Sequence, residues 1–173
     1  MITFGQVYRG KKIEVVRKLF QEYNDSLGFD LGFQNFKEEL ESLPGEYSPP
    51  AGSLLLAVSG ERAAGCAALR MIDNSTCEMK RLYVCPAFRG RGIGKELCRR
   101  IIAAGLERGY SSMRLDTLTS MSAALELYRS LGFREIEPYR YNPIEGAVFM
   151  ELRLSPPGAL AIPPHLLKNF RID

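Results

Sequence analysis

The chain has 173 residues, of which 46% are hydrophobic and 25% charged, and one hydrophobic core can cover a chain of this size and composition. No apolar run approaches the length that crosses a bilayer, and the first residues lack the pattern of a secretory signal, so we expect a cytoplasmic protein without a membrane span. A formal net charge of +3 is too small to indicate a nucleic-acid partner.

Cysteine and histidine usage narrows the chemistry further. The cysteines at positions 66, 77, 85 and 98 show no C-x-x-C spacing, so no disulfide framework is indicated. His165 is the only histidine, which makes Ser-His-Asp or Cys-His catalysis and histidine-rich metal sites hard to build. We therefore expect no bound metal.

The first third of the chain predicts a short strand at 2–8 and a helix at 11–23. The helix has one apolar stripe, formed by Ile13, Val16, Leu19, Phe20 and Tyr23. A second short helix is predicted over 34–43, where Pro44 and Gly45 stop it.

The middle of the chain predicts a meander of three strands. Residues 54–58 and 63–72 flank a polar turn, which is typical of an antiparallel hairpin, and a third strand follows at Thr76–Val84. A helix that ends at Gly109 and a strand at 111–118 come next, and this strand-helix-strand unit implies a right-handed crossover with parallel pairing.

The last part predicts a helix at 120–131 that Gly132 stops, and final strands from Phe133 onward and at 146–154. We expect one mixed α/β domain over 1–154 and a C-terminal tail over 155–173, with one helical turn at 165–170.

Charged residues are unevenly distributed. Lys and Arg dominate residues 80–114, and Asp and Glu dominate residues 21–46. Two solvated helix faces would explain both runs. The functional interpretation is that an anionic ligand binds at the basic run and a cationic ligand near the acidic run. Nucleic-acid binding is disfavoured because Tyr83, Phe88 and Tyr110 are too few and too scattered among the basic residues.

A glycine-rich turn precedes the predicted helix after residue 92. Gly90, Gly92 and Gly94 would leave backbone N–H groups unpaired at the positive end of the helix dipole, where phosphate oxygens bind. A tight strand-to-helix connection would use the same glycines. The spacing excludes two nucleotide-binding loops: a dinucleotide fingerprint needs glycine where Lys95 stands, and a P-loop needs Ser or Thr where Glu96 stands.

Two ordered motifs resemble the GNAT superfamily of N-acetyltransferases. Arg89, Gly92 and Gly94 are similar to its acetyl-CoA motif Gln/Arg-x-x-Gly-x-Gly/Ala, and residues 127–133 are similar to its later Leu-Tyr-x-x-Leu-Gly-Phe. The resemblance covers about 54–154. It implies a mainly antiparallel central sheet with one splayed parallel strand pair and helices on both faces.

The resemblance also implies an activity, namely transfer of an acetyl group from acetyl-CoA to a primary amine by direct attack in a ternary complex, without a metal. The acceptor would be a small-molecule amine or a lysine or N-terminal amine of a protein, and the acidic stretch weakly favours a cationic one. A non-catalytic coenzyme A-binding module on the same fold is the alternative. A homodimer stays open.

Individual positions carry over from the family by motif. Backbone groups of the glycine turn would hold the pyrophosphate and those of 82–84 the pantetheine arm, and the implied cofactor-binding residues are Leu82, Tyr83, Val84, Arg89, Gly90, Arg91, Gly92, Ile93, Gly94 and Lys95. Arg89 and Arg91 could add charge at the phosphates or simply be solvated. Met121 stands where the family often has asparagine, which puts the fine placement of the arm in doubt.

Glu78 and Tyr128 are the implied catalytic residues. An acceptor ammonium must lose a proton before it attacks, and Glu78 stands where many members place the general base. The alternative is a strand-surface carboxylate paired with Lys80 or Arg70. Tyr128 matches the tyrosine that protonates the leaving thiolate, although an aromatic residue at helical spacing also suits the core. Tyr83 could instead hydrogen-bond in the acceptor pocket.

Overall fold

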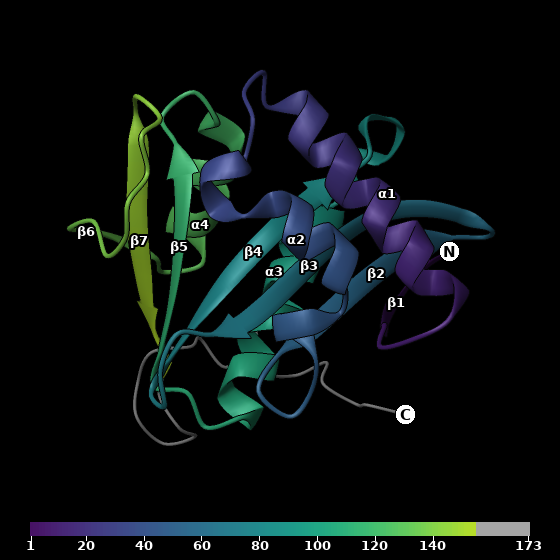
Figure 1. Ribbon diagram of the computed structural model, residues 1–173, viewed down its shortest axis with the longest axis horizontal. Helices are drawn as coiled ribbons and strands as arrows, with labels where there is room; N and C mark the ends of the chain where they lie inside the picture. Colours follow the sequence, from purple (N-terminus) through teal and green to yellow (C-terminus); the bar gives the residue numbers. More distant parts are fainter. Residues whose placement is uncertain (155–173) are drawn as a thin grey trace.

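Residues 1–154 are described by the computed structural model, in which seven strands form one sheet (Figure 1). The strands are β1 (Ile2–Gln6), β2 (Ser53–Ser59), β3 (Arg62–Met71), β4 (Thr76–Val84), β5 (Ser112–Leu118), β6 (Arg134–Ile136) and β7 (Ala147–Arg153). Their order across the sheet is β1-β2-β3-β4-β5-β7-β6. Only β4 and β5 pair in parallel, and every other neighbouring pair is antiparallel.

Helices cover both faces of this sheet. The helices are α1 (Lys11–Ser26), α2 (Phe36–Ser42), α3 (Ile93–Glu107) and α4 (Ser122–Ser130), with short 3-10 turns η1 (Gly32–Gln34), η2 (Gly45–Tyr47) and η3 (Pro86–Phe88). In Figure 1, α1 and α2 lie in front of the sheet and α3 and α4 behind it. The mixed sheet with one parallel pair and helices on both faces confirms the predicted fold class.

The sequence of β2 explains why the sheet is covered on both sides. Its run of apolar residues sends Leu54 and Leu56 into the cluster under α1 and α2, and Leu55 and Ala57 into the cluster under α3. Alternate residues of a strand point to opposite faces, so a strand that is apolar throughout must be buried on both.

Some element boundaries differ from the predicted ones. The strand at Thr76–Val84 has the predicted ends, but α1 continues three residues beyond residue 23. The helix expected over 34–43 is divided, because Asn35 adopts a left-handed conformation with φ 55° between η1 and α2. α4 begins at Ser122, since Met121 is its non-helical N-cap. The turn expected at 165–170 lies outside the described residues.

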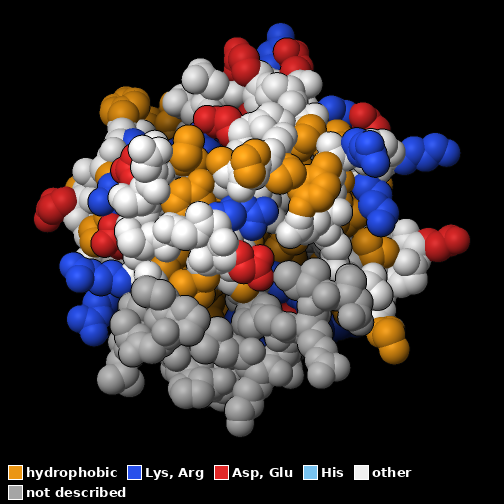
Figure 2. Space-filling view, turned by 90° about the horizontal axis from the view of Figure 1, so that it is seen from below, with side chains coloured by type: hydrophobic (Ala, Val, Ile, Leu, Met, Phe, Trp, Pro, Cys, Tyr) orange, Lys and Arg blue, Asp and Glu red, His pale blue; other side chains and the backbone are white. Residues whose placement is uncertain are grey.

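Among the helices of residues 1–154, none is both long and apolar enough to cross a membrane. The surface seen in Figure 2 mixes hydrophobic side chains with charged side chains of both signs.

Candidate active site

The site begins where the sheet splits. β4 and β5 are paired only through Thr76–Glu78 and Ser112–Arg114. Beyond Glu78, β4 stays with β3 and β5 stays with β7, so the two parallel strands separate. A groove of about 720 Å³ lies at this split, with 82–84 on one side and 118–124 on the other. The later part of β4 therefore has backbone groups without a β5 partner.

The glycine turn lies at the mouth of this groove. Gly90 and Gly92 have φ of 75° and 76°, a conformation that L side chains rarely adopt, and a Cβ at either position would meet nothing within 4 Å. Gly92 is the N-cap of α3, and no side chain caps that helix end. The first amides of α3 and the positive end of its dipole are thus available to an anion.

Most of the predicted cofactor-binding residues line the groove. Those that do are Leu82, Tyr83, Val84, Arg89, Gly90, Gly92, Ile93 and Gly94. Arg91 and Lys95 are not among the lining residues. The guanidinium of Arg91 instead lies 5.4 Å from the centre of the Phe88 ring. Arg89 Nε donates a hydrogen bond to the Val84 carbonyl at 3.1 Å, which holds its side chain against the end of β4.

A bulge in β4, which the sequence analysis did not predict, shapes the wall of the groove. Cys66 pairs with Tyr83 and Ala68 with Lys80, so Arg81 and Leu82 together face the single residue between Cys66 and Ala68. Arg81 has a φ of 56°, and left-handed backbone of this kind persists in a residue other than glycine only when its surroundings hold it there.

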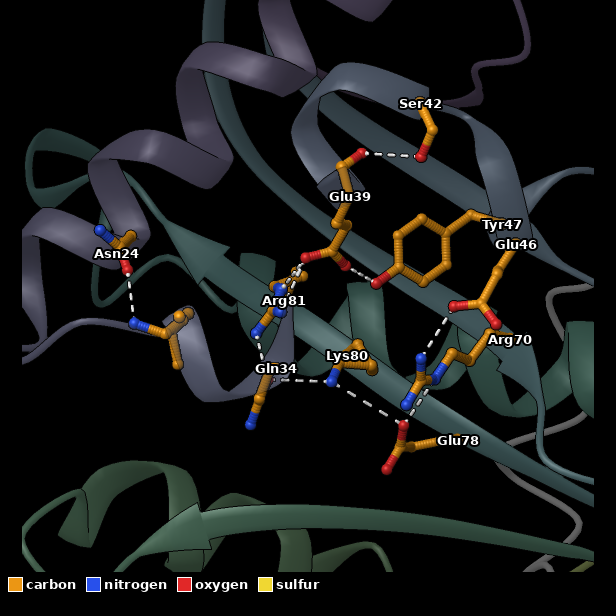
Figure 3. Close-up of polar contacts among 12 residues, drawn as sticks. Asn24, Gln34, Glu39, Ser42, Glu46, Tyr47, Arg70, Glu78, Lys80 and Arg81 are labelled. Carbon is orange, nitrogen blue, oxygen red and sulfur yellow. Dashed lines mark hydrogen bonds and ion pairs between the residues drawn. The ribbon is translucent and has the colours of Figure 1, made fainter. Parts of the chain in front are cut away.

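The side chain of Arg81 provides that restraint. It is 4% exposed, and its Nη2 and Nε lie 2.7 and 3.0 Å from Glu39 Oε2 of α2. Its Nη1 donates to Gln34 Oε1 at 3.0 Å, and its guanidinium lies over the Phe36 ring. The Tyr47 hydroxyl also donates to Glu39. The hydrogen bonds and ion pair of Arg81 therefore hold the segment from η1 to η2 against the bulge (Figure 3).

An inner pocket of about 80 Å³ continues from the groove. Tyr23, Leu27, Leu82, Leu118, Met121 and Ala124 line both spaces. The pocket adds polar side chains that the groove lacks, namely Gln34, Lys80, Arg81, Asp116, Thr117, Tyr128 and Asn142. A small polar group that follows the groove to its end would meet these side chains.

Tyr128 reaches the inner pocket from α4. It is 7% exposed, and its ring packs edge-on against Phe133 at 5.8 Å between ring centres. Burial raises the pKa of its hydroxyl well above the ordinary value, so the group keeps its proton at neutral pH. Within residues 1–154, no side chain or backbone group forms a hydrogen bond with the Tyr128 hydroxyl. The core and the proton-donor interpretations of Tyr128 are thus compatible.

Glu78 lies on β4 in a buried ionic network rather than at the surface. Its Oε1 accepts from Arg70 Nε at 2.8 Å, and its Oε2 accepts from the Tyr139 hydroxyl at 2.5 Å and lies 3.3 Å from Arg140 Nη2. The pairing with Arg70 considered from the sequence is present, but the carboxylate is fully buried and lines neither the groove nor the inner pocket.

Two acidic residues of the N-terminal third form ion pairs with arginines of the sheet. Glu39 pairs with Arg81, and Glu46 pairs with Arg70 at 2.8 Å. Lys80 and Arg81 likewise lie beneath η1 and α2 and do not line the groove, so Arg89 is the one basic residue of 80–114 among its lining residues. The ion pair between Glu39 and Arg81 thus joins the acidic run to the basic run inside the protein.

Asp116 and the segment after β6 supply site residues that the sequence analysis missed. Arg140 Nη2 lies 2.6 Å from Asp116 Oδ1, and Asn142 Nδ2 donates to Asp116 Oδ2 at 3.0 Å. Burial alone would raise the pKa of Asp116, but Arg140 lowers it below its ordinary value, so the carboxylate is ionised. The sequence contained one signal for this site, an acidic residue in the middle of a predicted buried strand.

In residues 1–154 no three His, Cys, Asp or Glu side chains gather as a metal site would require.

Comparisons with known structures agree with the fold. The crystal structure of an acetyltransferase of the GNAT family from Staphylococcus aureus matches with a TM-score of 0.75 at 22% identity, over 90% of this chain and all (100%) of that one. A Salmonella typhimurium structure that contains the cofactor acetyl-CoA matches with a TM-score of 0.64 at 20% identity, over 94% of this chain and 98% of that one.

Sequence comparison gives the family. The model of the acetyltransferase (GNAT) family matches residues 14–133. An uncharacterized N-acetyltransferase from Schizosaccharomyces pombe is 41% identical over 156 residues, which cover 89% of this chain and 96% of that protein. The chain belongs to the GNAT family, as its two motifs predicted.

Proposed function

We propose that the protein transfers an acetyl group from acetyl-CoA to a primary amine of a small molecule or a protein, by direct attack within a ternary complex. One observation carries this proposal: the N-terminus of α3 has no side-chain cap, begins with glycines and faces a groove at the split of the sheet. Oriented backbone amides in such a position suit a pyrophosphate.

The groove suits coenzyme A along its length. Amides of 90–94 would hold the pyrophosphate, because Gly90 and Gly92 leave open space where other residues would have a side chain. The stretch 82–84 of β4 would hydrogen-bond the pantetheine arm in place of the missing strand, since its pairing with β5 ends at Glu78. Met121 lines both the groove and the inner pocket, so its thioether would lie near the end of the arm.

The inner pocket suits the reaction. An amine held beside the ionised Asp116 would be close to the end of the groove, where the thioester would lie. Tyr128, which keeps its proton, would protonate the leaving sulfur. Glu78 is the sequence-based candidate for the general base, and because it lines neither space it would have to act through an intervening group.

Two measurements test the proposal. Calorimetry should detect binding of coenzyme A to the folded protein, and a thiol-release assay with a panel of amines should detect turnover. Tyr128→Phe should lower kcat roughly 10-fold or more with coenzyme A affinity retained, because only the proton donor is removed. Tyr8→Phe, at an exposed tyrosine beyond the site, is the matched control. Binding without any thiol release would support a non-catalytic coenzyme A-binding module instead.

A further inference from the structure

Lys80 occupies an unusual place between two cavities. Its side chain is 4% exposed, and it lines both the inner pocket and a separate cavity of about 330 Å³ beneath α2 and η2. Gln34 is the other residue that lines both. A proton that reaches Lys80 from the inner pocket thus has a second space, bordered by the exposed residue Glu38, through which to return to solvent.

The surroundings of Lys80 do not favour a permanent ammonium ion. Its Nζ donates to the neutral side chain of Gln34, at 3.0 Å from Oε1. The one carboxylate within ion-pair distance in residues 1–154 is Glu78, at 3.9 Å, beyond hydrogen-bonding range. That carboxylate is already bound at closer range by Arg70, Tyr139 and Arg140 (Figure 3 shows Lys80 between Gln34 and Glu78).

The charges that face Lys80 come from four directions. Arg81 adjoins it on β4, Arg70 approaches from β3 and Arg140 from the segment before β7, while Glu78 and, across the split, Asp116 oppose them. Burial, which is the largest influence, and the nearby arginines, Arg81 first among them, together lower the pKa of Lys80 to about 7, although Glu78 acts in the opposite direction. A substantial share of Lys80 is therefore neutral near neutral pH.

We propose that the neutral amine of Lys80, rather than a carboxylate, is the general base that takes the proton from the acceptor ammonium. This inference rests on the proposed acetyl transfer and adds the residue that starts it. Glu78 then becomes a positioning residue, whose charge stabilises the Lys80 ammonium once the proton has arrived.

The step balances as follows. The acceptor ammonium gives one proton to Lys80 Nζ, and the freed lone pair of its nitrogen forms a bond to the thioester carbonyl carbon. The C–S bond breaks and sulfur keeps the electron pair. Tyr128 gives its proton to that sulfur and regains one from the nitrogen, which yields the amide and the free thiol. Lys80 finally releases its proton to water.

A base of this kind matches the task better than an ordinary carboxylate. Moving a proton from an ammonium of pKa ~10.4 to a carboxylate of pKa ~4.3 is unfavourable by about a millionfold. Moving it to an amine whose pKa is about 7 is unfavourable by only about a thousandfold. A base that is regenerated near the working pH also turns over without a long wait in its protonated form.

The competing role for Lys80 is to hold an anionic group of the acceptor as a fixed cation, and Lys80→Arg separates the two. Arginine keeps the positive charge but cannot accept a proton. As a base, Lys80 cannot be replaced by arginine or methionine: both variants should bind coenzyme A normally and lose roughly 10²–10⁴-fold in kcat. The rise of wild-type kcat with pH, centred near 7, should disappear in both. Lys12→Arg, at an exposed position of α1, is the control.

Two further readouts keep the inference refutable if a variant folds poorly. In the wild-type protein, ¹⁵N NMR of lysine Nζ should show one lysine that titrates near pH 7 and is absent in Lys80→Met. An acceptor of low basicity, already neutral at the assay pH, should lose much less rate in Lys80→Met than an alkylamine does.

Retention of the wild-type rate and pH profile by Lys80→Arg would overturn the inference in favour of anion binding. Unchanged kcat in Lys80→Met, or titration of Lys80 only above about pH 9, would overturn it as well. Failure of the proposed function looks different, because the wild-type protein itself would then bind no coenzyme A or release no thiol with any amine, and the inference would fall with it.

Discussion

Gly92→Ala isolates the contribution of the turn before α3. Gly92 has φ 76° and open space at its Cβ position, so an added methyl group meets no protein atom and the cost to folding is that of left-handed backbone, about 1–2 kcal/mol. At about 2–4 °C per kcal/mol for a chain of this size, the thermal midpoint should fall by several degrees. The methyl group would stand in the space that a phosphate needs, and coenzyme A should bind at least about tenfold more weakly, or about 1.4 kcal/mol.

Gly60→Ala is the matched control for that variant. Gly60 has φ 59°, also with nothing within 4 Å of an added Cβ, in the turn between β2 and β3, and it lines none of the three cavities. Urea unfolding should show similar losses for both variants, and calorimetry should show weaker coenzyme A binding only for Gly92→Ala. Equal coenzyme A affinity in the two variants would refute phosphate binding at this turn.

Three further variants test the network around the site. Glu39→Gln leaves Arg81 buried without its charge partner and should cost about 3–5 kcal/mol in urea unfolding, against about 0–1 for the exposed Glu135→Gln. Asp116→Asn should raise the KM for the acceptor roughly tenfold with coenzyme A affinity unchanged, since one charge that attracts the ammonium is lost. Between about pH 7 and its ordinary pKa of ~10.4, Lys80 binds fewer protons in the folded chain than in the unfolded chain, so it makes the free energy of unfolding rise with pH over this range. Urea unfolding of Lys80→Met at several pH values should lack this rise. An identical rise in the variant would contradict the low pKa of Lys80.

The parts of the fold that sequence reasoning predicted are those specified locally. The strand Thr76–Val84 was placed at its true ends because the polar turn at 73–75 precedes it and a loop that contains Pro86 follows it. The glycines at 90, 92 and 94 indicated a turn before a helix, and in the structure Gly90 and Gly92 adopt left-handed backbone just before α3. Both signals arise within a few residues of the feature that they predict.

The bulge and the buried ionic networks depend instead on residues far apart in the chain. Glu39 is 42 residues from Arg81, and Arg140 is 24 residues from Asp116, so no local pattern pairs them. One clue was present, since the adjacent charged residues Lys80 and Arg81 break the alternation of β4 where its register shifts by one residue. The sequence left Glu78 as a general base or a strand-surface carboxylate paired with Lys80 or Arg70, and only the folded chain shows it buried between the guanidinium groups of Arg70 and Arg140.

In the part of the chain that the structure describes, the short parallel pairing at Thr76–Glu78 is the one connection between two parts of the sheet, β1–β4 and β5–β7. Glu78 belongs to the last residue pair of this connection and binds Arg70 of the first part and Arg140, in the segment before β7, of the second. The carboxylate of Glu78 therefore links the two parts of the sheet at the point where they separate. If the protein acts as proposed, this link would keep the two walls of the coenzyme A groove at one separation, and the loops beyond the split could change to suit another acceptor without altering that groove.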